Sequence, residues 1–195
     1  MTPLLLIRHG ATAWNAAGRI QGQTDVPLSP RGRREVAAWR LPEAWQDARW
    51  LASPLGRARE TAALLTDRPV AIDPRLSEMD WGAWEGQRLT ELRAAAPAVM
   101  AQNEARGLDF RPPGGESPRE VCARLRLLIA ELAAAPTPVV AVTHKGVMRA
   151  ALVLATGWDM RGKPPHRLQR DRAFALACSS DGRLELAGPP LPLAA

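Results

Sequence analysis

Two histidines stand directly after the two most strand-like segments of the sequence. Leu4–Ile7 is a continuous apolar run that leads into an Arg-His-Gly triplet containing His9, and Val139–Thr143 is a second run, followed by His144. Apolar runs of this kind are typical of parallel strands buried on both faces, whose carboxyl ends meet at one edge of a sheet. If the two strands are neighbours, the histidines lie close together at that edge.

Two arginines are expected to add positive charge to the same region. Arg8 precedes His9, and Arg57 lies on the first turn of a helix predicted over residues 56–65, after a short strand predicted over residues 50–53. Helix N-termini favour anions, and a guanidinium group presents a planar fork of donors to phosphate. Taken alone, the first triplet also fits an ordinary strand end. Together, two arginines and two histidines predict a site for a tetrahedral, doubly charged phosphoryl group.

Chemistry at phosphorus needs a nucleophile and a proton donor. His9 can attack through a neutral imidazole nitrogen, provided that the arginines suppress its protonation. Glu78 follows a short strand predicted over residues 70–72 and is the candidate acid. Its carboxyl must be protonated to donate, which desolvation by Met79 and Trp81 favours. By itself, Glu78 is also compatible with a solvated carboxylate.

The remaining segments predict an α/β chain that forms a single domain over residues 1–195. Residues 79–135 are read as a helical lid, an excursion that covers the site, and residues 188–195 as a Pro-rich, frayed tail. Turn residues, caps and periodicity further predict a helix opened by Ser29-Pro30 with Val36, Trp39 and Leu41 on its apolar face, a capped helix from Ser117, a helix over residues 147–155, and an edge hairpin formed by residues 173–177 and 184–187.

Composition limits the classes of partner. The formal charge of +6 comes almost entirely from arginine, with Lys145 and Lys163 as the lysines, and it is scattered along the chain. This predicts a basic, solvated surface without a nucleic-acid footprint, and a polyanionic small molecule as the better ligand. Cys122 and Cys178 fit buried apolar positions. With no basic leader and no apolar run of about 20 residues, we expect a cytoplasmic protein that neither spans nor binds a membrane.

These motifs, taken together and in order, resemble the histidine phosphatase superfamily, the phosphoglycerate-mutase-like enzymes. The resemblance covers residues 4 to about 156, and the matching pieces are Leu6–Gly10 with Thr12 and Trp14-Asn15, Gln21-Gly22 with Asp25–Ser29, Ser53–Arg57 with Thr61, Ser77-Glu78 with Trp81-Gly82 and Glu85-Gly86, Pro113–Ser117, and Thr143-His144. It implies a three-layer α/β/α fold with a largely parallel central sheet, and a phosphohistidine intermediate. No metal or organic cofactor is implied.

The resemblance also implies a role for each matched residue. His9 would be the phosphorylated nucleophile, and Arg8, Arg57 and His144 would hold the phosphoryl group. Glu78 would donate a proton to the leaving oxygen and later activate water. The residues at the substrate pocket would be Asn15, Gln21 and Gly22.

Departures from the family pattern bear on whether the enzyme is a phosphatase, which hydrolyses its substrate, or a mutase, which moves the phosphoryl group from one hydroxyl group to another. Gly86–Leu89 stands where mutases have Gly-Leu-Asn-Lys, the lid is short, and Lys145-Gly146 follows the second histidine where mutases have Gly-Asn. A mutase must hold its substrate while it reorients, whereas a phosphatase needs only to admit water. We therefore predict a phosphomonoester hydrolase for a small soluble phosphate ester, with a mutase and a catalytically weak phospho-ligand scaffold as alternatives. Lys145 either binds a second anionic group or is simply solvated, and the oligomeric state stays open.

Overall fold

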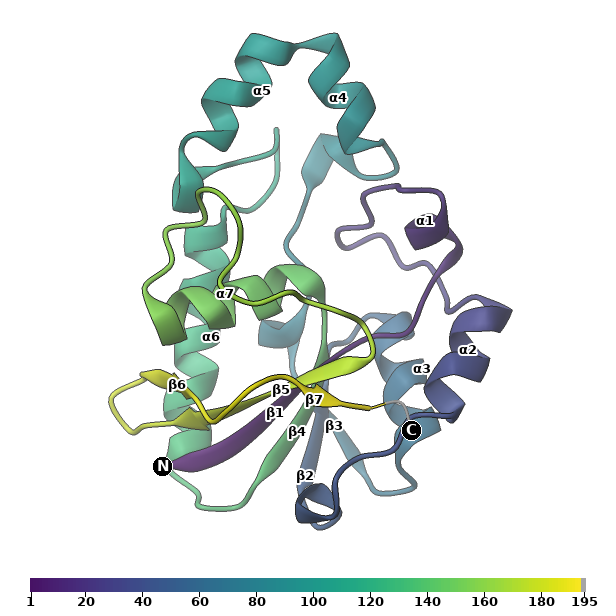
Figure 1. The fold of residues 1–195 in the computed structure, drawn as a ribbon, viewed down its shortest axis with the longest axis vertical. Helices are drawn as coiled ribbons and strands as arrows, with labels where there is room; N and C mark the ends of the chain where they lie inside the picture. The colour runs from purple at the N-terminus through teal and green to yellow at the C-terminus, as the bar shows by residue number, and fades with distance from the viewer. Residues whose placement is uncertain (194–195) are drawn as a thin grey trace.

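A mixed sheet forms the centre of the protein (Figure 1), in a computed structural model that describes residues 1–193. The strand order is β3-β2-β4-β1-β5-β6, with β7 beside β5. The first four strands in this order run parallel, and β5, β6 and β7 add antiparallel neighbours. The strands are β1 (Thr2–Arg8), β2 (Arg49–Ala52), β3 (Val70–Ile72), β4 (Val139–Thr143), β5 (Arg172–Cys178), β6 (Leu184–Leu186) and β7 (Leu191–Pro192).

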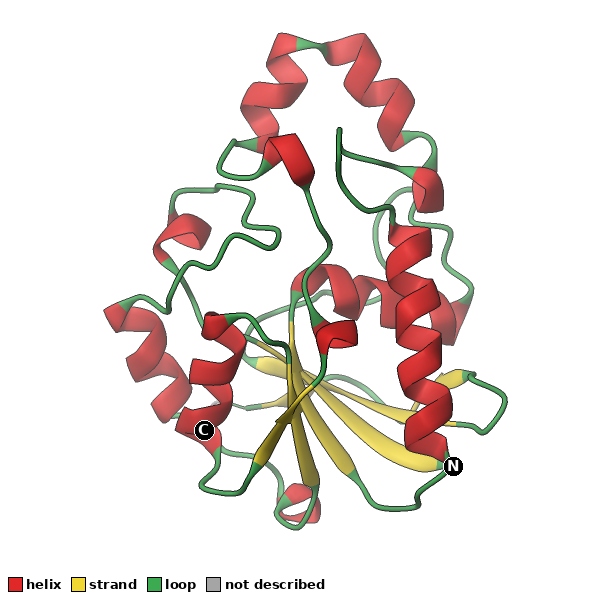
Figure 2. Ribbon diagram, turned by 180° about the vertical axis from the view of Figure 1, so that it is seen from behind, coloured by secondary structure: helices red, strands yellow, loops and turns green. Residues whose placement is uncertain are grey.

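Helices cover both faces of this sheet and complete three layers (Figures 1 and 2). On one face, α6 (Pro118–Ala133) and α7 (Lys145–Thr156) pack in a cluster with Leu4 and Leu6 of β1. On the other, α2 (Pro30–Ala37) and α3 (Gly56–Leu65) pack with Leu5 and Ile7. Successive side chains of a strand point to opposite faces, so this uniformly apolar strand supplies both layers of the core. The predicted three-layer fold with a largely parallel sheet is confirmed.

An arch of two helices, α4 (Leu89–Ala95) and α5 (Pro97–Glu104), stands at the end of the molecule away from the sheet (Figure 2). Only Met100 is buried in these two helices, whereas α6 buries an apolar stripe that includes Leu125 and Ile129. The predicted excursion of residues 79–135 therefore has two parts with different roles. The arch contributes Leu89, Arg93 and Glu104 to the lining of a cavity, and α6 belongs to the layer that packs on the sheet. Short helical turns are α1 (Ala13–Ala16), η1 (Glu43–Trp45), η2 (Pro74–Leu76), η3 (Gly82–Trp84) and η4 (Gly107–Asp109).

Two local expectations were wrong. Helix α2 ends at Ala37, so Trp39 and Leu41 lie beyond it; Trp39 is nevertheless buried, because the chain turns back toward the core there. The tail after Gly188 is held rather than frayed: β7 pairs with β5, and the carbonyl of the buried Leu193 accepts a hydrogen bond from the Arg40 N–H. Residues 194–195 of the predicted tail lie outside the described residues.

Among the helices of residues 1–193, none has the length and apolar character needed to cross a membrane.

Candidate functional site

Strands β1 and β4 bring the two histidines together. The strands are parallel neighbours in which Arg8 is paired with Thr143, so His9 and His144 leave the sheet side by side. The His9 N–H donates to the Thr143 carbonyl at 2.9 Å, and the two imidazole rings lie 5.0 Å apart between centroids. The juxtaposition predicted from two strand ends is thus present.

The His9 ring is set in one tautomer. Its Nδ1 lies 2.7 Å from the Gly10 carbonyl oxygen, which can only accept, so Nδ1 carries the proton and Nε2 keeps a free lone pair. The side chain is almost fully buried. Burial, and then the charges of Arg57 and Arg8, lower the pKa of His9 well below its ordinary value. The ring is therefore neutral and nucleophilic at neutral pH.

His144 is completely buried behind this ring. Its Nε2 lies 2.7 Å from the Ser53 hydroxyl, while its Nδ1 is buried with no hydrogen-bond partner within residues 1–193. Burial, together with the neighbouring His9 and Arg57, lowers the pKa of His144 well below its ordinary value. Although it does not line the cavity itself, its ring lies against that of His9.

Arg57 is fully buried on the first turn of α3, as predicted from its position after the second strand. Its guanidinium donates to the carbonyls of Gly22 at 2.6 Å and Thr24 at 2.8 Å, and its Nε has no partner among the described residues. Arg57 therefore lies behind the cavity wall and not on it. Its charge acts on His9 from there, and the free Nε is an unused donor.

Arg8 lines the cavity directly. Its Nε is also buried without a partner, and no carboxylate within residues 1–193 forms an ion pair with it. Burial, followed by the nearby charge of Arg170, lowers the pKa of Arg8 to about 10. An unpaired, desolvated guanidinium of this kind is ready to bind an anion.

Glu78 is held against the start of α7. Its Oε1 accepts hydrogen bonds from the N–H groups of Met79 and Gly146, each at 2.9 Å. A Cβ at position 146 would lie 2.2 Å from that oxygen, so glycine permits the approach. Burial raises the pKa of Glu78, although both N–H groups and the charges of Arg57 and Arg8 act in the opposite sense. A raised pKa suits a carboxyl group that donates a proton.

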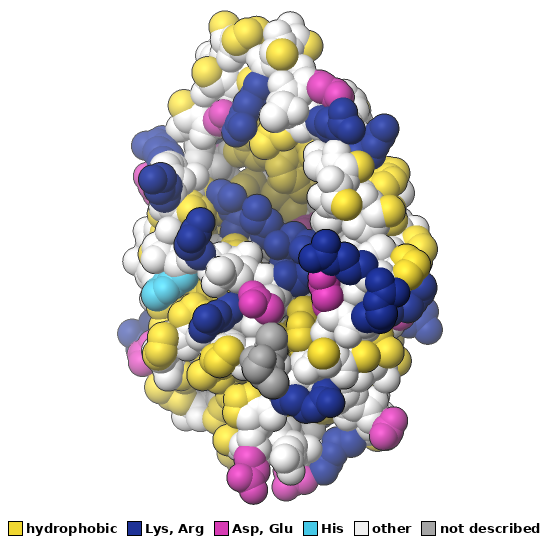
Figure 3. All heavy atoms as spheres, turned by 45° about the vertical axis from the view of Figure 1, so that its right-hand side comes forward, with side chains coloured by type: hydrophobic (Ala, Val, Ile, Leu, Met, Phe, Trp, Pro, Cys, Tyr) yellow, Lys and Arg dark blue, Asp and Glu magenta, His cyan; other side chains and the backbone are white. Residues whose placement is uncertain are grey.

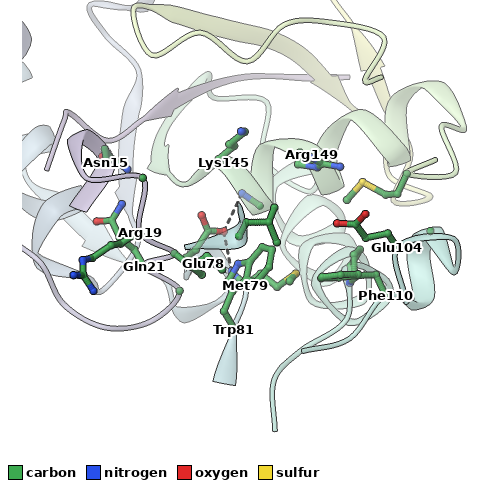
Figure 4. Close-up of a pocket in the computed structure, with 18 of the residues that line it drawn as sticks. Asn15, Arg19, Gln21, Glu78, Met79, Trp81, Glu104, Phe110, Lys145 and Arg149 are labelled. Carbon is green, nitrogen blue, oxygen red and sulfur yellow. Dashed lines mark hydrogen bonds between the residues drawn. The ribbon is translucent and has the colours of Figure 1, made fainter. Parts of the chain in front are cut away.

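The cavity beside these residues has a volume of about 990 Å³. Figure 3 shows it as a hollow with apolar side chains inside and lysine and arginine at its rim. In Figure 4, Glu78 lies between the Asn15 and Gln21 side and the Arg149 side. Trp81 lines the cavity. Trp84 does not, but its ring lies 6.4 Å from that of Trp81.

Three predicted pocket residues line the same cavity near the first turn: Asn15, Gln21 and Gly22. The backbone N–H of Thr12 donates to Asn15 Oδ1 at 3.1 Å, and its hydroxyl donates to Gln21 Oε1 at 2.9 Å. Because the amide oxygens are occupied, the NH₂ groups are the atoms left to donate to a ligand. Gly22 has a positive φ of 52° and a carbonyl that holds Arg57, so its contribution includes placing that arginine.

Lys145, the first residue of α7, is exposed and lines the cavity. Desolvation by burial, and then the charges of Arg8 and Arg149, lower the pKa of Lys145. Sequence reasoning missed several other lining residues, of which the most informative are Arg149, Glu104 and Phe110. Arg149 could have been found from helical periodicity had the predicted helix been started at Lys145, where α7 begins, because the two residues are four positions apart.

Comparisons with known proteins agree with this geometry. A model of the histidine phosphatase superfamily (branch 1) matches residues 4–181. A glucosyl-3-phosphoglycerate phosphatase of Mycolicibacterium vanbaalenii is 38% identical over 176 residues, covering 83% of this chain and 77% of the relative. A mycobacterial glucosyl-3-phosphoglycerate phosphatase complexed with VO3 superposes with a TM-score of 0.80, at 32% identity, covering 98% of this chain and 100% of that one.

Relatives named as mutases are also similar. A probable phosphoglycerate mutase of Klebsiella pneumoniae is 35% identical over 162 residues, covering 78% of this chain and 74% of the relative. The phosphatases match at higher identity, which favours the phosphatase branch, as predicted from the short lid. The resemblance and the enzyme class inferred from the sequence are both confirmed. The chain belongs to the histidine phosphatase superfamily.

Proposed function

We propose that this protein hydrolyses a phosphate monoester through a phosphohistidine at His9. The observation that carries the proposal is the tautomer of the His9 ring, whose protonated Nδ1 faces the Gly10 carbonyl and leaves Nε2 free to attack. Arg8 lines the cavity beside His9, Arg57 acts on the ring from behind the cavity wall, and Lys145 at the start of α7 adds a further positive charge to the cavity, so the region suits an anion.

In the first step, His9 Nε2 attacks phosphorus and the bond to the ester oxygen breaks. The electron pair goes to the leaving oxygen, which takes the proton of Glu78. The cations neutralise the charge that the phosphoryl oxygens carry in the transition state. Asn15 and Gln21 donate their NH₂ groups to the same oxygens.

In the second step, the Glu78 carboxylate takes a proton from water, whose oxygen attacks phosphorus. The bond between phosphorus and His9 Nε2 breaks, its electron pair returns to the ring, and inorganic phosphate leaves. Side chains of this chain carry out each step, so the scheme requires no metal or cofactor. The histidine and the carboxyl are both restored for the next cycle.

The substrate is a small phosphate ester that carries a glycerate group, as the names of the phosphatase relatives indicate. The cavity of about 990 Å³ has room for more than a phosphoryl group, and its apolar wall with Trp81 and Phe110 offers a surface for a sugar or similar substituent.

We further propose a single domain over residues 1–195, a cytoplasmic location and no nucleic-acid partner.

The phosphoenzyme is the decisive test. Rapid quenching with ³²P-labelled 3-phosphoglycerate should trap an acid-labile, alkali-stable phosphate on the protein, located at His9 by peptide mapping and absent from His9→Ala. Release of inorganic phosphate at the same rate as phosphoenzyme decay identifies a phosphatase. A phosphoenzyme that is stable in water but quickly discharges onto phosphoglycerate would identify a mutase. Equal background rates for wild type and His9→Ala would support a non-catalytic scaffold.

A further inference from the structure

Arg149 presents a second cation to the cavity, separate from those around His9. It lies on the second turn of α7 and lines the cavity together with Lys145 and Glu78. In Figure 4, its guanidinium lies toward the side of Glu104 and Phe110, away from Asn15 and Gln21. It therefore faces the part of the cavity that a substituent beyond the phosphoryl group would enter.

Trp158 holds this guanidinium in place. The Arg149 Cζ lies over the Trp158 ring, 5.0 Å from its centroid, at a distance typical of a cation–π contact. The indole is itself anchored, because its Nε1–H donates to the Arg161 carbonyl at 3.0 Å. Stacking uses the face of the guanidinium and leaves its N–H groups, which lie in the plane, available as donors.

The charge of Glu78 attracts Arg149, but no carboxylate of the described residues pairs with it directly. Within residues 1–193 it forms no ion pair, although Glu104 on the same cavity wall pairs with Arg93 at 2.7 Å. Its side chain is partly buried, so the charge is also partly desolvated. A fixed, half-buried guanidinium with free donors costs stability unless a ligand supplies the anion.

Its place in the helix defines the distance from the reacting group. Gly146 contacts Glu78, the proton donor to the ester oxygen, and Arg149 follows three residues later, a rise of about 4.5 Å. A group two carbon atoms away from the ester oxygen would come within reach of the long arginine side chain. One planar fork with a single charge matches one carboxylate.

From this geometry we infer that Arg149, positioned by Trp158, forms a subsite that binds a carboxylate of the substrate two carbons from the ester oxygen. The inference rests on the proposed function for its reaction but concerns recognition alone. It assigns the selectivity for acidic phosphate esters to the second turn of α7. Trp158 is a positioning residue, because it acts through the guanidinium.

Two substrates that differ at one group test the subsite. 3-Phosphoglycerate and glycerol 3-phosphate share a skeleton, with a carboxylate in the first where the second has a hydroxymethyl group. We expect wild type to prefer 3-phosphoglycerate in kcat/KM, and Arg149→Gln to reduce the ratio by about 10- to 100-fold, the loss expected for charge-assisted hydrogen bonds. Arg126→Gln, an exposed position on α6 with no ion pair in the described residues, is the matched control and should keep the ratio.

The Trp158 variants separate positioning from folding. Trp158→Phe keeps an aromatic face and should retain most of the ratio, while Trp158→Leu should lower it at an unchanged far-ultraviolet circular dichroism spectrum. A structural role alone would not produce this rescue. No preference in wild type, or an equal ratio in Arg149→Gln, would overturn the inference.

Calorimetry separates this result from failure of the proposed function. His9→Ala should bind 3-phosphoglycerate more tightly than glycerol 3-phosphate, and adding Arg149→Gln should remove the difference. If wild type hydrolysed neither ester while the double variant still lost that difference in binding, the subsite would be upheld and the phosphatase refuted. Equal binding of both ligands by His9→Ala would refute the subsite whatever the activity.

Discussion

Two pairs of buried or half-buried arginines in this protein are treated in opposite ways. Beside α6, Arg75 pairs with Asp73 at 2.6 Å and Glu131 at 2.7 Å, and Arg124 pairs with Glu116 at 2.8 Å. Around the cavity, Arg8 and Arg57 have no ion pair with any described carboxylate, and each keeps a buried Nε without a partner. The same side chain is compensated in one region and left uncompensated in the other.

The pKa values follow this division. Hydrogen bonding to Asp73 raises the pKa of Arg75, whereas burial lowers that of Arg8 to about 10. Glu78, the carboxyl on which the charges of Arg57 and Arg8 act, has a raised pKa because burial outweighs their attraction. Pairs beside α6 stabilise the fold, and uncompensated groups around the cavity are expected to cost stability until an anion binds. This contrast identifies the functional region from electrostatics alone.

The largest expected effect is that of Glu78→Gln, which keeps the shape of the side chain and removes its proton. We expect kcat/KM for 3-phosphoglycerate to fall by about 10²–10⁴, the usual contribution of a general acid. The loss should be much smaller for 4-nitrophenyl phosphate, because nitrophenolate leaves without protonation. Equal losses on both substrates would show that Glu78 does not protonate the leaving group. Glu43→Gln, at an exposed position, is the control.

The activity of wild type should depend on pH through the protonation of Glu78. Glu78 must be protonated for the first step, so kcat/KM for 3-phosphoglycerate should decline as pH rises through the raised pKa of Glu78, and this limb should be absent in Glu78→Gln. On the acid side, the lowered pKa of His9 keeps the ring neutral, so that limb lies below pH 6.5. Stability should change as well: because folding raises the pKa of Glu78 above 4.5, wild type loses stability relative to Glu78→Gln as pH rises above that value.

Arg8→Met tests the uncompensated group itself. Removing one preorganised donor should lower kcat/KM by about 10²–10³. The melting temperature should stay the same or rise, because the variant also removes a desolvated charge without breaking an ion pair. Activity assays and thermal unfolding of the same preparation check both parts. A lower melting temperature together with unchanged kcat/KM would contradict the division between the two groups of arginines.

The sequence predicted the parts of the site that depend on strand ends. His9 and His144 follow uniformly apolar segments, and such segments become adjacent parallel strands whose ends meet. The same reasoning placed Arg57, which lies on the first turn of the helix that follows β2, the other parallel neighbour of β4. Glu78 was named because it follows the third predicted strand, but its contact with Gly146 links two segments 68 residues apart and has no local signal.

Features that depend on the path of loops were not predictable in this way. Arg57 was expected to hold the phosphoryl group, which its free Nε still allows. Its contacts with the carbonyls of Gly22 and Thr24 depend on the path of a loop and had no signal in the sequence. The tail was expected to fray because it is rich in proline, yet β7 pairs at the β5 edge, where a two-residue strand leaves little pattern. The cation–π pair of Arg149 and Trp158 likewise depends on the turn after α7.

The smallest effect on activity is expected for Arg124→Met, on the compensated side of the comparison. Arg124 donates to Glu116 and to the carbonyl of Ser77 at 2.8 Å, so its removal leaves partners without donors. We expect a loss of about 1–3 kcal/mol in the free energy of unfolding, and about 2–4 °C in Tm for each kcal/mol. The change in kcat/KM should stay below about tenfold. Some change is expected because Arg124 holds the carbonyl of Ser77, which is next to Glu78. Arg126→Met, exposed on the same helix, should alter neither quantity. If Arg124→Met kept full stability but lost activity as Arg8→Met does, ion pairing would not distinguish structural arginines from those reserved for substrate.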